Sequence, residues 1–156
     1  MNKETQSIIR NIENTLKGQP WFGRAVYEIL EEVKEDDVHK KPGGKGHSII
    51  ELLYHMLNWA DFTLSRLKKN PELNPVDFEK MDWREIDPAI HTWKNGMEHL
   101  KKKHEQIVSV LQNKEDDFLK EKVEEREYNF RFLLNGFIQH NIYHLGQIAY
   151  INKLQQ

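Results

Sequence analysis

The sequence predicts an all-α protein, a four-helix bundle. Four long segments carry apolar residues at helical spacing, so each would present one apolar stripe to a shared core. The chain has no convincing alternation of apolar and polar residues, the pattern of a half-buried strand. Its mean hydropathy is low, at −0.80, which long helices with charged outer faces explain. With 156 residues and no internal repeat, residues 1–156 are expected to form one domain.

The first helical segment spans residues 5–34 and is expected to break near its middle. Gly18-Gln19-Pro20 interrupts it, and proline lacks the backbone N–H that a helix interior needs. The residues on both sides keep helical spacing: Ile8, Ile9, Ile12, Leu16, Trp21, Phe22, Val26, Ile29, Leu30 and Val33.

The second helix is predicted to begin after a glycine-rich loop, residues 41–46. Ser48 is a good N-cap residue, and Glu51 stands three positions later, as a capping box requires. The helix should run to about Lys69, because Asn70-Pro71 disfavours its continuation.

A long connection, residues 71–86, is expected to be mostly irregular and could cross one end of a bundle. Asp87-Pro88 has the form of an N-cap followed by proline at the first helical position, which predicts a third helix from Pro88 to about Asn113.

A charged stretch, residues 114–127, follows the third helix. Its Phe118, Leu119 and Val123 predict partial packing against the bundle. The fourth helix is predicted over residues 128–154 and is the most apolar of the set.

Composition excludes several classes of protein. Basic and acidic residues number 23 and 25 and are interspersed, so the chain lacks the basic footprint of a nucleic-acid binder. No apolar run approaches the roughly 20 residues needed to span a membrane, and the N-terminus lacks a signal-peptide core. The absence of cysteine fits a reducing compartment. We therefore expect a cytoplasmic protein whose partner is a small-molecule substrate.

Two of the eight histidines, His140 and His144, stand four residues apart on an apolar face of the fourth helix. Their Cβ atoms would lie roughly 5–6 Å apart, close enough for both imidazoles to bind one ion. The alternatives are a pair of core histidines bonded to carbonyls, or a pair at an interface. The histidines expected on solvated surfaces are His39, His99 and His104.

His55 adds a third histidine on an apolar face, that of the second helix, which also carries Leu52, Trp59 and Phe62. A lone histidine there is more often a hydrogen-bonded core residue than a ligand. Three buried histidines all need partners, however, because an unpaired buried polar group costs about 1–3 kcal/mol. One divalent cation would satisfy all three and leave coordination positions open, as in catalytic metal sites.

At these residues the chain resembles the DinB-like superfamily of metal-dependent proteins, which includes the bacillithiol and mycothiol S-transferases. The matching segments are Ser48-Ile-Ile-Glu-Leu-Leu-Tyr-His55 and His140-Asn-Ile-Tyr-His144-Leu-Gly-Gln-Ile148. The resemblance implies an up-down-down-up four-helix bundle, metal ligation by His55, His140 and His144, and a homodimer. Many members carry tryptophan where this chain has His47, which would either line the pocket or replace an apolar contact.

An open three-histidine site fits two chemistries. In the first, which the resemblance implies, the metal holds an external low-molecular-weight thiol as its thiolate for transfer to a small electrophile. In the second, the metal activates water for hydrolysis, with Glu51 as the nearest candidate general base. A bundle that binds metal or ligand without catalysis, and a dimerisation module with a structural metal, are further alternatives. Three imidazoles suit several metals, with zinc or nickel favoured.

The substrate pocket is expected to involve Trp59 and Asn58 from the second helix. Other candidates are Tyr143, Trp21, Arg24 and Tyr27. Arg24 could hold a substrate carboxylate through two hydrogen bonds or form a surface ion pair. For the aromatic residues, the alternative is ordinary core packing.

Overall fold

The computed structural model describes residues 2–69 and 75–156, and its regular elements in these ranges are helices. One isolated antiparallel bridge, between Lys122 and Asn129, is the exception. The predicted all-α fold is confirmed. The α-helices are α1 (Lys3–Lys17), α2 (Val26–Glu31), α3 (Ile49–Leu67), α4 (Pro75–Asp82), α5 (Trp93–Gln112) and α6 (Phe130–Leu154), and the 3₁₀ turns are η1 (Glu35–Asp37), η2 (Pro42–Gly44) and η3 (Asp116–Lys120).

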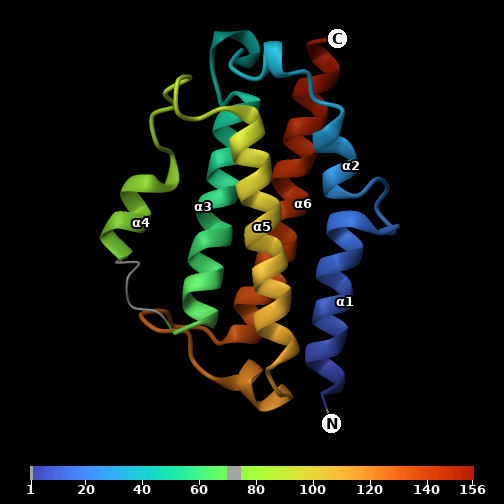
Figure 1. Ribbon diagram of the computed structural model, residues 1–156, viewed down its shortest axis with the longest axis vertical. Helices are drawn as coiled ribbons and strands as arrows, with labels where there is room; N and C mark the ends of the chain where they lie inside the picture. The colour runs from blue at the N-terminus through green and yellow to red at the C-terminus, as the bar shows by residue number, and fades with distance from the viewer. Residues whose placement is uncertain (1, 70–74) are drawn as a thin grey trace.

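The long helices α1, α3, α5 and α6 form the bundle. Each of α3 and α1 packs against both α5 and α6, which closes a ring of four. In Figure 1, α1 and α6 run upward and α3 and α5 run downward. The short α2 packs on α6, and α4 lies outside the ring against α3 (Figure 1).

The predicted break in the first helical segment separates α1 from α2. Gly18 ends α1, and its N–H donates to the Asn14 carbonyl. A Cβ at Gly18 would lie 2.8 Å from the Asn14 Cα, so only glycine fits this close approach. The prediction that Trp21 and Phe22 continue the apolar stripe is wrong. Both lie in the connection between the helices and are exposed, Trp21 fully.

The capping box predicted for α3 is confirmed. The Ser48 backbone N–H donates to Glu51 Oε2 at 2.7 Å, and the Glu51 N–H donates to Ser48 Oγ at 3.4 Å. Lys41 adds an ion pair to the same carboxylate at 2.9 Å. These contacts fix where α3 begins and therefore which of its side chains face the core.

The connection before α5 contains more structure than expected. Residues 75–82 form α4, where a mostly irregular segment was predicted, and Phe78 is buried there. Packing against α3 stabilises this short helix, and Asn58 donates to the Phe78 carbonyl at 3.3 Å. Residues 70–74, which include the predicted stop at Asn70-Pro71, lie outside the described residues.

The predicted start of the third helix at Pro88 is wrong, since α5 begins at Trp93. Thr92 is its N-cap and accepts from the Asn95 N–H at 3.2 Å. The preceding residues form a separate turn in which the Asp87 carbonyl accepts from the His91 N–H at 2.7 Å. The Asp87 N–H donates to His91 Nδ1 at 2.8 Å and closes that turn.

The charged segment before α6 is partly packed, as predicted. Phe118, Leu119 and Val123 are buried, and η3 carries the first two. Asn129 then caps α6 by accepting from the Phe132 N–H at 3.0 Å. The fourth predicted helix is confirmed to within two residues of its expected start.

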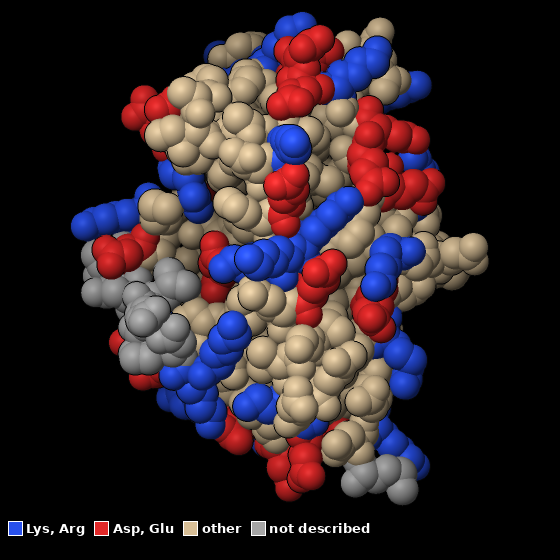
Figure 2. All heavy atoms as spheres, viewed as in Figure 1, with Lys and Arg blue, Asp and Glu red and all other residues tan. Residues whose placement is uncertain are grey.

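The outer surface carries both signs of charge. Acidic and basic side chains are interspersed over the face seen in Figure 2, as the composition suggested. Among the described residues, no helix combines the length and apolar character required to span a membrane.

Candidate metal centre

Three histidines from two helices converge inside the bundle. His55 comes from α3, and His140 and His144 come from successive turns of α6. The Nε2 atom of His140 lies 3.0 Å from His55 Nε2 and 3.1 Å from His144 Nε2. One ring nitrogen from each histidine lies within 4.8 Å of the other two, so the cluster could hold a metal ion.

The outward-facing ring nitrogens of two of these histidines are held by hydrogen-bond acceptors. His144 Nδ1 lies 2.6 Å from Gln147 Oε1, one turn further along α6. His55 Nδ1 lies 3.2 Å from the Asp82 carbonyl oxygen and 2.8 Å from its carboxylate Oδ1. The carbonyl contact has hydrogen-bond geometry, and the carboxylate contact adds electrostatic attraction. Because an acceptor faces each Nδ1, the proton resides there and leaves the Nε2 lone pair directed at the cluster.

Burial keeps the three imidazoles neutral, which is the form that binds metals. Desolvation lowers the pKa of His140 to about 3, with a further contribution from His144 and His55. Desolvation also lowers the pKa of His55 and of His144, although Asp82 and Gln147 respectively offset part of the effect.

The donor set fits a divalent cation. If His140 carries its proton on Nε2, it can donate that proton to only one of its two neighbours. At least one inward lone pair would then lack a donor in a buried site, which is costly. A cation between the three nitrogens would accept all three lone pairs, as in three-histidine zinc sites.

An aromatic ring covers the cluster from the α4 side. Trp83 stacks on His55 with ring centroids 3.8 Å apart, and His47 stacks on the other face of Trp83 at 3.7 Å. His47 is therefore separated from the cluster by the indole. Neither Asp82 nor Trp83 was predicted from the sequence as part of the site. The one local signal for them was a tryptophan, Trp83, within a charged segment.

A largely apolar cavity of about 180 Å³ adjoins the cluster between α3 and α6. His140 belongs to both the cluster and the cavity wall. Trp59, one of the predicted pocket residues, lines it, and its ring lies 5.5 Å from that of His140. The other lining residues are Thr63, Tyr128, Phe132, Leu133, Gly136 and Phe137. Asn58, also predicted there, is buried and bonds to α4 instead.

The remaining predicted pocket residues lie elsewhere or at the surface. Arg24 is exposed and forms ion pairs with Glu28 and Glu32. Tyr27 places its hydroxyl 2.9 Å from His104 Nδ1, on the α5 side of α2. Tyr143 is exposed, with its ring 5.0 Å from that of His144.

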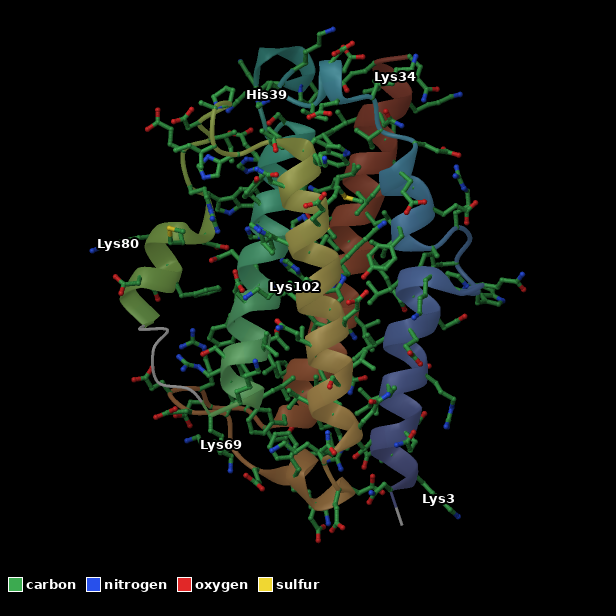
Figure 3. The ribbon with its side chains drawn as sticks, in the orientation of Figure 1. Lys3, Lys34, His39, Lys69, Lys80 and Lys102 are labelled. Carbon is green, nitrogen blue, oxygen red and sulfur yellow. The ribbon has the colours of Figure 1, made fainter. Side chains whose placement is uncertain are left out.

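His104 corrects the expectation of a solvated residue, because it is completely buried. Desolvation lowers its pKa to about 3. Lys102, which is exposed, lies on the face of α5 turned toward the viewer in Figure 3. His39 and His99 are exposed, as expected.

The chain matches the family model described as the DinB superfamily over residues 22–148. The match spans α3 and includes all three histidines of the cluster. No curated protein shows a match to the chain. Because this match covers most of the 156-residue chain, the chain belongs to the DinB superfamily.

Proposed function

We propose that the protein is a divalent-metal-dependent enzyme that joins an external low-molecular-weight thiol to a small electrophile. The observation that carries this proposal is the cluster of three neutral imidazoles, with His140 exposed to an apolar cavity. Three protein ligands leave positions for an exogenous ligand, as catalytic sites do. The chain has no cysteine, so the thiol must come from outside it.

Each residue of the site would have a separate role in this reaction. His55, His140 and His144 would hold the cation, for which zinc or nickel suits three nitrogen ligands. When bound, such a cation lowers the pKa of an adjacent thiol and so supplies the nucleophilic thiolate. Gln147 and Asp82 keep two of the imidazoles in the required tautomer and orientation. The mostly apolar wall of the cavity offers an apolar surface to the substrate beside His140.

The position of the acidic residues favours thiol transfer over hydrolysis. A hydrolase usually needs a carboxylate general base near the open side of the metal. Asp82 contacts the Nδ1 side of His55, which faces away from the other two histidines. Glu51 is engaged by Ser48 and Lys41. Among the described residues that line the cavity, none is acidic.

The test is a kinetic assay of thiol conjugation with the zinc-loaded or nickel-loaded protein. Reduced low-molecular-weight thiols are mixed with an alkyl halide, and the loss of free thiol is followed. The wild-type protein should accelerate the reaction, and His140→Ala should reduce the rate to the uncatalysed background. His99→Ala, an exposed histidine on α5, should stay within about twofold of wild type. No acceleration by metal-loaded wild type with any thiol would favour a non-catalytic bundle.

We further propose that the protein acts as a homodimer in the cytoplasm, where small thiols stay reduced. One face of α6 carries exposed large apolar side chains, a pattern that suits an interface. They are Phe132, Tyr143, Tyr150 and Leu154. Sedimentation should give the dimer mass for wild type and the monomer mass for Tyr150→Glu. A monomeric wild type would contradict the dimer.

A further inference from the structure

We infer that the cavity beside His140 receives an uncharged aromatic group, about one ring in size, of the electrophilic substrate. This inference rests on the proposed thiol transfer for the role of the ligand. Its evidence is the chemistry and size of the cavity, which adjoins the histidine cluster through His140.

The size of the cavity matches a single ring. It measures about 180 Å³, and an engineered apolar cavity of about 150 Å³ in another protein binds benzene. Aromatic side chains contribute much of the wall, including Trp59 from α3 and Phe137 from α6. Such walls offer edge-to-face and offset-stacked contacts to a bound ring.

The wall selects against charge. No charged side chain lines the cavity within the part of the chain that the structure describes. The Thr63 hydroxyl, one of the few polar groups there, already donates to the Trp59 carbonyl at 2.8 Å. A carboxylate or ammonium group would lose its hydration without gaining an ionic partner, which is unfavourable. Neutral apolar groups are therefore preferred.

The cavity also places its ligand beside the reactive site. The His140 ring forms part of its wall, while His140 Nε2 lies 3.0 Å from His55 Nε2. A ring in the cavity thus contacts a member of the cluster. For a benzylic halide, the thiolate sulfur would form the bond to carbon. The carbon–halogen bond would break, halide would leave with the bonding electrons, and the thiol proton would pass to solvent.

A substitution of Gly136 tests directly whether the cavity binds the ligand. It lies in the wall, and a Cβ built on it meets no atom within 4 Å. A leucine there would extend into open space at the wall and occupy part of the cavity, and leucine is also more favourable than glycine in a helix interior. Gly146 provides the matched control. It lies on the same helix, likewise has nothing within 4 Å of a Cβ, and does not line the cavity.

The experiment is calorimetric titration of toluene into protein freed of metal with a chelator. Wild type and Gly146→Leu should bind toluene saturably, and Gly136→Leu should bind it at least about tenfold more weakly. Circular dichroism and the mass in solution would be measured for both variants. Absence of toluene binding by wild type, or equal binding by Gly136→Leu, would overturn the inference.

A second arm separates this inference from the proposed function. In the conjugation assay, Gly136→Leu should raise KM for benzyl chloride by about tenfold or more and leave chloroacetamide, which has no ring, unaffected. Toluene binding without any conjugation would refute thiol transfer but leave the cavity ligand intact. Conjugation of chloroacetamide without toluene binding would support the transferase and refute the aromatic specificity.

Discussion

Replacing Gln147 with methionine tests how the cluster is oriented. The Gln147 Oε1 atom lies 2.6 Å from His144 Nδ1 and keeps the proton on that nitrogen. Methionine has a similar length but no comparable acceptor. Without the amide, His144 is free to rotate or to place its proton on Nε2, where it would oppose a cation.

The structure sets the size of this effect. Loss of such a supporting hydrogen bond weakens metal binding by about 10–100-fold, or about 1.4–2.7 kcal/mol. Gln147→Met should approach the upper end, because Gln147 is the one residue in the described part of the chain that is hydrogen-bonded to His144 Nδ1. Gln147→Glu keeps an acceptor and should bind at least as tightly as wild type. Competition for zinc with a coloured chelator, near neutral pH, measures each affinity.

A second glutamine on α6 provides the control. Gln139 is exposed, so Gln139→Met should leave zinc affinity unchanged. Gln147→Met with an affinity within about twofold of wild type would show that the hydrogen bond does not orient a ligand, and the reasoning would be refuted.

Three further predictions follow from the same contacts. Asp82→Asn should weaken zinc binding by only about tenfold, because the backbone carbonyl still faces His55; a loss as large as that of Gln147→Met would contradict this. Ser48→Ala should remove about 1 kcal/mol from the free energy of unfolding in urea, and an unchanged midpoint would argue against the cap. The pKa of His104 is about 3 in the folded chain. The unfolded chain therefore binds more protons than the folded chain below about pH 6.5. As a result, the free energy of unfolding decreases as the pH is lowered. His104 alone should contribute about 2 kcal/mol of this loss between about pH 7 and pH 5. His104→Gln lacks that contribution and keeps the loss due to His55, His140 and His144, whose pKa values are also lowered. Equal pH dependence of the two proteins would refute the prediction.

The sequence predicted the parts of the fold that depend on local patterns. The capping box at Ser48, the break at Gly18 and the periodic stripes of α1, α3 and α6 are properties of neighbouring residues. Helix α4 was missed because its stability comes from packing on α3, where Phe78 is buried, and short helices have weak local signals.

His104 shows how a pattern can be misread. The lysines beside it suggested solvent, yet Leu100, Ile107 and Leu111 lie at helical spacing from it and are all buried. Helical spacing is the more informative signal, because adjacent residues point to different faces. The same reasoning correctly placed His55 and His144 on buried faces.

The supporting residues of the site could not be predicted from the sequence. Asp82 and Trp83 are 27 and 28 residues away from His55 in the sequence. They contact it only because α4 packs against α3. Arg24, in contrast, stood near an apolar stripe in sequence but pairs with Glu28 and Glu32 at the surface.

The most direct test of the three-histidine metal site is the metal content of protein purified without an affinity tag and then supplied with zinc or nickel. Wild type and His99→Ala should each bind about one divalent ion per chain. His144→Ala should lose the ion and remain helical by circular dichroism. Wild type without bound metal, or His144→Ala with full occupancy, would contradict the assignment of His55, His140 and His144 as a shared metal site.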